Sequence, residues 1–181
     1  MGIILSVFTG IGKEEIMYQY GDKIKILDLD VKSMVEEVPP DSFVDTISSQ
    51  VNDYDIVFIP TNKSIREELE KNNIDYDVYY PSKERRQELI LKFVGGRMPF
   101  PEIAKFDNEC DKLINEIDAD ESPNCYKHKL SSSGQFAWND RVINNYINTV
   151  IEDAKKDRTG VEESPRGEDA NEEDKDRISG T

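Results

Sequence analysis

Histidine and cysteine are scarce in this chain, and their scarcity argues against two kinds of site. The 181 residues include one histidine, His128, and two cysteines, Cys110 and Cys125. A single histidine cannot form a histidine-based metal centre, and the cysteines do not make a close CxxC pair. Neither a zinc site nor a disulfide scaffold is therefore indicated. We expect two reduced thiols in a cytoplasmic protein.

Positive charge and long apolar runs are also scarce. Lysine and arginine together number 23 against 38 acidic residues, which gives a formal net charge of −15. A chain this acidic repels nucleic-acid backbones, so we expect no nucleic-acid partner. The apolar run at residues 3–8 is too short for a membrane span and lacks the flanks of a signal peptide, so we expect no membrane association.

Short apolar runs alternate with segments of helical pattern along most of the chain. We expect strands at residues 3–8, 24–29, 55–60, 75–80 and 125–130. We expect helices at residues 14–20, 41–51, 63–72 and 138–154. This alternation predicts a three-layer α/β fold with a mostly parallel sheet of about five strands, covered by helices on both faces.

Two further patterns predict core positions. The tyrosines of the fourth expected strand, Tyr76, Tyr79 and Tyr80, are expected in the sheet core. In the last expected helix, an apolar side at helical spacing predicts the face that packs on the sheet. That side consists of Trp138, Val142, Tyr146 and Val150.

Two segments differ from the alternating pattern. Residues 82–118 read as a helix, a break at Gly95–Pro99 and a second helix, which together form a lid-like helical excursion. From residue 156 the chain is acidic, has no aromatic residue and has almost no large apolar one. Such a composition cannot bury enough surface to order the chain, so we predict a domain at 1–155 and a disordered acidic tail at 156–181.

The first expected strand leads into the segment Thr9-Gly10-Ile11-Gly12-Lys13-Glu14. A phosphate-binding loop needs a tight glycine turn after a strand, inward backbone N–H groups, a lysine, and the positive end of the next helix. The consensus GxxxxGK[ST] is only partly met, because Val7 occupies its first glycine position and Glu14 its hydroxyl position. The segment is therefore either a phosphate loop or an ordinary strand–glycine–helix turn.

Several motifs occur in an order that resembles a known family. They are Phe8–Lys13, Asp28-Leu29-Asp30, Pro60–Glu67 and Tyr79–Arg86, and they cover most of residues 3–150. In this order the chain resembles small P-loop proteins encoded by bacteriophages, which are adenylate kinase-like members of the nucleoside-monophosphate kinase class. The resemblance implies a P-loop NTPase-like fold with a lid, and transfer of the γ-phosphate of ATP to a nucleotide or similar small acceptor. For a phage protein the location would be the host cytoplasm.

The resemblance also implies roles for individual residues. The nucleotide would bind to Thr9, Gly10, Ile11, Gly12, Lys13 and Glu14. The acceptor would bind to Asp28, Asp30, Asn62, Lys63 and Arg66. Catalysis would involve Lys13 together with the excursion cations Arg86 and Arg97.

Each of these roles has a plain structural alternative. Asp28 and Asp30 could instead be solvated acidic residues at the end of a strand. Arg66 could pair with Glu70 one helical turn later. The run that contains Arg86 could form an exposed helix face.

Glu14 is the departure that bears most on activity. The usual hydroxyl at this position holds Mg²⁺. Glu14 and Asp28 are the candidate metal ligands here, yet Glu14 also brings negative charge near the triphosphate, and Glu15 adds to it. At about 5 Å and an effective dielectric constant of about 20, one such repulsion is roughly 3 kcal/mol. Three functions therefore stay open: a small nucleotide kinase, a degenerate P-loop domain with a binding or regulatory role, and a protein-interaction module that uses the acidic tail.

Overall fold

One parallel sheet of five strands organises the molecule. The computed structural model describes residues 2–31 and 38–159. The strands are β1 (Ile3–Val7), β2 (Ile26–Asp28), β3 (Ile56–Ile59), β4 (Tyr76–Pro81) and β5 (Cys125–Leu130). They lie in the order β2-β3-β1-β4-β5, and every neighbouring pair is parallel. The prediction of an α/β fold with a parallel five-stranded sheet is confirmed.

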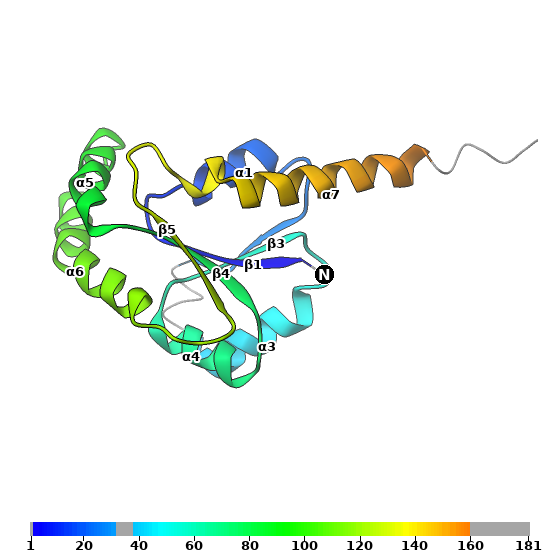
Figure 1. Cartoon of the computed structure of the whole chain (residues 1–181), viewed down its shortest axis with the longest axis horizontal. Helices are drawn as coiled ribbons and strands as arrows, with labels where there is room; N and C mark the ends of the chain where they lie inside the picture. Colours follow the sequence, from blue (N-terminus) through cyan, green and yellow to red (C-terminus); the bar gives the residue numbers. More distant parts are fainter. Residues whose placement is uncertain (1, 32–37, 160–181) are drawn as a thin grey trace, which may run out of the picture.

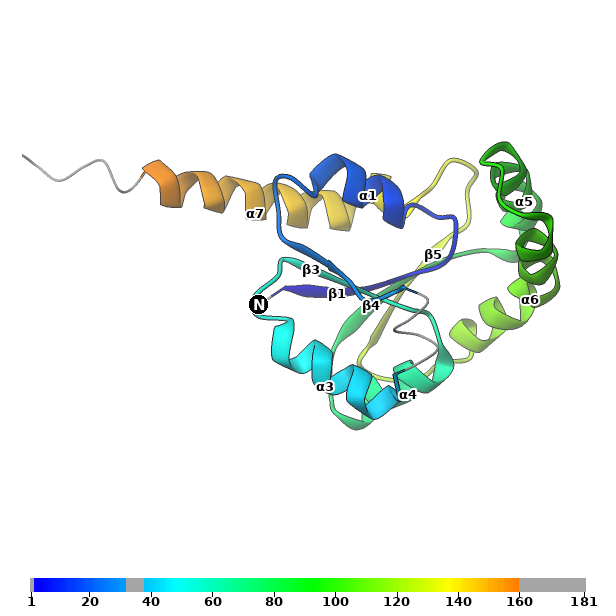
Figure 2. The same ribbon diagram turned by 180° about the vertical axis from the view of Figure 1, so that it is seen from behind.

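Helices cover both faces of this sheet. They are α1 (Lys13–Tyr20), α3 (Pro40–Gln50), α4 (Lys63–Lys71), α5 (Arg86–Gly95), α6 (Phe100–Asp118) and α7 (Arg141–Thr159). Two short 3₁₀ turns, η1 (Lys83–Arg85) and η2 (Ala137–Asn139), precede α5 and α7. In Figures 1 and 2, α1 and α7 lie on one face, α3 and α4 lie on the other, and α5 and α6 stand beyond the carboxyl ends of the strands. In the described parts of the chain no helix has the length and apolar character that a membrane crossing needs.

The central strands carry the core because they are covered from both sides. All four residues of β3 are fully buried, as the continuous apolar run predicts. The three tyrosines of β4, Tyr76, Tyr79 and Tyr80, are at most 3% exposed, which confirms that they belong to the core. The sheet is therefore a rigid platform for the loops at its carboxyl edge.

The last helix begins later than predicted, and one residue of its predicted apolar side is exposed. Asp140 Oδ1 accepts a hydrogen bond from the Val142 N–H at 2.8 Å, so the helix starts after Asp140 and Trp138 lies before it in η2. The buried residues of α7 are then Ile143 and Ile147, whereas Val142 is 56% exposed. Of the predicted apolar side, Trp138, Tyr146 and Val150 pack against the core and Val142 does not, so the prediction was wrong at Val142 alone. The helix continues to Thr159, beyond its predicted end at residue 154 and the predicted domain limit of 155. Residues 160–181 of the predicted tail lie outside the described residues.

The strand order makes the connections after β1 and β3 diverge at the carboxyl edge of the sheet. Because β3 lies between β1 and β2, the order differs from the doubly wound orders in which β1 and β2 are neighbours. The chain leaves β1 toward α1 on one face, and it leaves the adjacent β3 toward α4 on the other (Figure 1). In open parallel sheets, ligands bind in the crevice that opens where such connections part.

Candidate functional site

A tight turn joins β1 to α1. The Ile11 N–H donates to the Phe8 carbonyl at 3.3 Å, and both Gly10 (φ 86°) and Gly12 (φ 119°) have left-handed backbone conformations. Gly12 immediately precedes α1, and within the described residues no side chain caps this helix start. The first-turn N–H groups of α1 therefore form a positive end that can accept an anion.

Both glycines of the turn are also required by close packing. A Cβ atom at Gly10 would lie 2.6 Å from the Phe93 ring, and one at Gly12 would lie 2.6 Å from Trp138 Cδ1. The Ile11 carbonyl accepts a hydrogen bond from the Ala137 N–H at 2.7 Å. The glycine pattern that predicts a phosphate loop is thus equally a requirement of the contacts that α5 and η2 make with the turn.

Lys13, which follows β1, lies between two carboxylates at the carboxyl end of β2. Its Nζ is 3.2 Å from Asp28 Oδ2 and 3.1 Å from Asp30 Oδ2, and it also donates to the Asp30 carbonyl at 3.1 Å. The side chain therefore crosses the carboxyl end of β3, which lies between these strands. The structure brings the predicted lysine together with the two predicted aspartates.

Charge and burial at this cluster act in opposite directions. Burial alone would lower the pKa of Lys13, but Asp30 and Asp28 outweigh it and raise that pKa above its usual range. Burial raises the pKa of Asp30, although Lys13 opposes this shift. Lys13 is consequently a charged ammonium at neutral pH, with two partners that already neutralise it.

The predicted metal ligands do not form a ready magnesium site. Asp28 Oδ1 accepts a hydrogen bond from the Asp30 N–H at 3.0 Å, and both Asp28 oxygens contact Lys13. Glu14 is exposed on the first turn of α1. Among residues 2–31 and 38–159, no group of three or more acidic, histidine or cysteine side chains is placed to hold a metal ion. In this arrangement the Lys13 ammonium is the cation that Asp28 binds.

Lys92 of α5 reaches the turn and was not predicted. Its Nζ donates to the Gly10 carbonyl at 3.0 Å and pairs with Glu15 at 2.9 Å. It also lies 4.9 Å from the centroid of the Phe136 ring. No local signal in the sequence marks Lys92, because its partners are about 80 residues away. Glu15, expected only to add repulsion, has a counter-charge in the fold.

The base of the helical excursion packs directly on the turn. Phe93 of α5 and Phe106 of α6 pack edge to face with a centroid separation of 4.8 Å. Phe106 in turn packs edge to face with Phe8 at 6.1 Å. The helix pair α5–α6 therefore packs against the turn.

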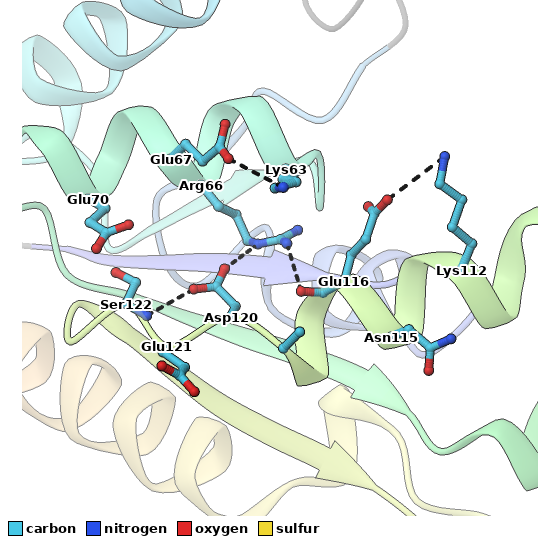
Figure 3. Close-up of a pocket in the computed structure, with 11 residues that line it drawn as sticks. Lys63, Arg66, Glu67, Glu70, Lys112, Asn115, Glu116, Asp120, Glu121 and Ser122 are labelled. Carbon is cyan, nitrogen blue, oxygen red and sulfur yellow. Dashed lines mark hydrogen bonds and ion pairs between the residues drawn. The ribbon is translucent and has the colours of Figure 1, made fainter.

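Arg66 lies in a separate cleft between α4 and the end of α6, shown in Figure 3. Its side chain is 2% exposed, its Nε donates to Asp120 Oδ2 at 2.8 Å, and its other nitrogens donate to the Thr61 and Glu116 carbonyls. The partner is Asp120, and the alternative pairing with Glu70 is not formed. The cleft has a volume of about 710 Å³.

The other predicted acceptor residues lie at the start of α4. Lys63 lines the same cleft as Arg66 and pairs with Glu67 at 3.5 Å, and Asn62 is exposed just before the helix. Neither Asp28 nor Asp30 lines this cleft. The structure thus divides the predicted acceptor set into one group around Lys13 and another around Arg66.

Arg86 and Arg97 do not contact the turn. Arg86 pairs with Asp107 at 2.6 Å and with Asp111 at 3.4 Å, which joins α5 to α6. Arg97 is exposed and has φ 59°, whereas Gly96 has φ −78°. The left-handed residue that ends α5 is therefore the arginine, so the backbone freedom of the neighbouring glycines is not used.

Comparisons with known proteins do not assign the chain to a family. No family model matches it, and no curated protein matches it. The resemblance to phage P-loop proteins stays a prediction based on the motifs.

Proposed function

We propose that the turn Thr9–Glu14 binds the phosphate groups of a nucleotide such as ATP. The observation that carries this proposal is the position of Lys13. Lys13 opens α1, whose start carries no side-chain cap, and its ammonium lies beside Asp28 and Asp30 at the carboxyl edge of the sheet. Backbone N–H groups, a helix dipole and a lysine at one edge of the sheet can bind an anion even in a protein of high negative charge.

In the first form of the proposal the protein is a small phosphotransferase whose site is arranged like that of a nucleotide kinase. The γ-phosphate of ATP passes to a nucleotide or similar small acceptor held near Asp28 and Asp30. Lys13 and the α1 amides stabilise phosphate charge, and the helix pair α5–α6 excludes water from the reacting groups. Any Mg²⁺ would arrive with the nucleotide, since the residues present do not preform its site.

A second candidate is a nucleotide-binding or regulatory domain without transfer activity. The specific observation that favours it is the engagement of Lys13 with both Asp28 and Asp30, beside the exposed Glu14. The acidic tail would supply a protein contact in this form. Both forms are proposed for the cytoplasm, which suits the two free, buried thiols of Cys110 and Cys125.

Trp138 gives a direct measurement of binding. It is the only tryptophan of the chain and its ring contacts the position of Gly12. We expect ATP to change its fluorescence and to raise the melting temperature. The variant Lys13→Met should reduce the response, and Lys105→Met, on the exposed surface of α6, serves as the matched control.

Turnover then separates the two forms. ADP formation that depends on an added nucleoside monophosphate supports the kinase, and binding without turnover supports the regulatory domain. If millimolar ATP changes neither the fluorescence nor the melting temperature, both forms are wrong.

A further inference from the structure

Two lysines approach the turn from different elements, and they are held in different ways. Lys13 comes from α1 itself and Lys92 from α5. We infer that Lys92, and not Lys13, is the cation that the phosphate groups of a ligand in the turn recruit first. This inference rests on the proposed function, because it concerns the same turn.

The partners of Lys13 oppose its release. Its side chain is 13% exposed and contacts two carboxylates, those of Asp28 and Asp30. If the ammonium turned toward a ligand, these two like charges would face each other in a partly buried place without their shared cation. The ligand would have to compensate both.

The partners of Lys92 oppose its release much less. Its side chain is 38% exposed, and it has one carboxylate partner, Glu15, together with a neutral carbonyl, that of Gly10. Exposed pairs of this kind contribute little to stability, so exchanging Glu15 for a phosphate oxygen costs little. Only one carboxylate is released, and its side chain is 35% exposed.

Phe136 supplies a partner that Lys92 keeps during the exchange. The Lys92 ammonium is 4.9 Å from the centroid of this ring, and the Arg85 guanidinium is 5.2 Å from it. The π face of an aromatic ring stabilises a cation without neutralising its charge. Lys92 therefore stays at the rim of the turn with its charge available, and its move to a ligand would bind α5 to that ligand.

Glu15 is then the built-in competitor of the ligand. One of its oxygens pairs with Lys92, and the other, Oε2, is buried and has no hydrogen-bond partner in the described residues. Neutralising Glu15 should release Lys92 and remove a repulsion near the phosphates. The variant Glu15→Gln is thus expected to bind a polyphosphate more tightly than the wild-type chain.

The test is a titration of the full chain with sodium tripolyphosphate at constant ionic strength, followed by Trp138 fluorescence. Lys92→Met should weaken binding about tenfold, the usual size for loss of one charge-assisted hydrogen bond. Lys13→Met should weaken it by less than about threefold on the same scale. Glu15→Gln should tighten it several-fold, and the double variant Glu15→Gln/Lys92→Met should lose that gain. Lys105→Met is the control, and Lys92→Arg should retain most of the affinity.

The titration distinguishes a failure of this inference from a failure of the proposed function. If Lys13→Met weakens binding more than Lys92→Met, the inference is overturned while the proposed function stands. The same holds if Lys92→Met and Lys92→Gln, each shown to unfold at the wild-type urea midpoint, bind as the wild-type chain does. If the wild-type chain itself does not bind tripolyphosphate at millimolar concentration, the proposed function and this inference both fail.

Discussion

Lys13 and Arg66 were both predicted to contact a ligand, and both are largely buried, but their surroundings differ. Lys13 is held by two carboxylate side chains and one backbone carbonyl at the carboxyl edge of the sheet. Arg66 is held by one carboxylate and two backbone carbonyls in the cleft between α4 and α6. One site is built largely from side chains, and the other largely from main chain.

This difference separates a cation held mainly by side chains from one held mainly by the main chain. A carboxylate side chain can rotate and take another partner, whereas a buried carbonyl is fixed by the fold and is left unsatisfied when its donor leaves. Removing Arg66 would therefore orphan groups at Thr61, Glu116 and Asp120 together. Burial of a cation in a cleft is thus weaker evidence for ligand binding than the nature of its partners.

Arg66→Met should give the largest loss of stability. The variant removes a cation that is 2% exposed and leaves Asp120 and two carbonyls without their donor. Breaking a buried ion pair from one side costs about 3–5 kcal/mol. Urea unfolding followed by circular dichroism measures this loss directly.

The matched control is Lys63→Met, in the same cleft. Lys63 is 63% exposed and forms only a pair with Glu67 one turn later, so its loss should be below about 0.5 kcal/mol. If the two variants lost equal stability, Arg66 would be no more a structural cation than its exposed neighbour Lys63.

Lys13→Met should give an intermediate loss that depends on pH. The variant leaves Asp28 and Asp30, which are 17% and 29% exposed, as two unpaired like charges, at a cost of about 2 kcal/mol at pH 7. The pKa of Asp30 is already raised in the folded state by burial, and loss of Lys13 raises it further. A carboxyl group with a raised folded-state pKa binds its proton more tightly when folded, so stability rises as pH falls through that pKa.

The deficit of Lys13→Met relative to the wild-type chain should therefore shrink between pH 7 and pH 4, as measured by urea midpoints. The variant Lys13→Met/Asp30→Asn is the control, because it lacks the titrating group and should show a flatter difference. A deficit that grows on acidification would contradict the assigned role of Asp30.

The sequence was sufficient for the sheet because its signals are local. Each strand is a short apolar run, such as Ile56–Ile59, bounded by polar or turn residues, and the alternation with helical segments implies parallel pairing. The meeting of Lys13 with Asp28 and Asp30 also follows, because residues after parallel strands converge at one edge of the sheet. These features need no knowledge of how the helices pack.

The contacts that distinguish the site depend on packing between distant segments. Lys92 meets Gly10 and Glu15 only because α5 docks on the turn, and Arg66 meets Asp120 only because α6 ends beside α4. Sequence spacing favoured the local partner Glu70 for Arg66, and tertiary structure supplied a different one. Charged residues on helices have many equivalent local partners, so their long-range partners cannot be derived from periodicity.

Arg97→Gly should give the smallest effect, and it should be a gain. Arg97 is exposed and has φ 59°, a conformation that costs a non-glycine residue about 1 kcal/mol. The glycine variant relieves this strain, but much of the gain is lost to the greater entropy of glycine in the unfolded chain, so we expect a net gain of at most about 0.5 kcal/mol. Arg97→Ala removes the same guanidinium but keeps a Cβ atom, so it should show no comparable gain.

If Arg97 acts on a transferring phosphoryl group, both variants should lower turnover equally while only the glycine variant raises the urea midpoint. A stability gain of equal size in both variants would show that the strain is not in the backbone.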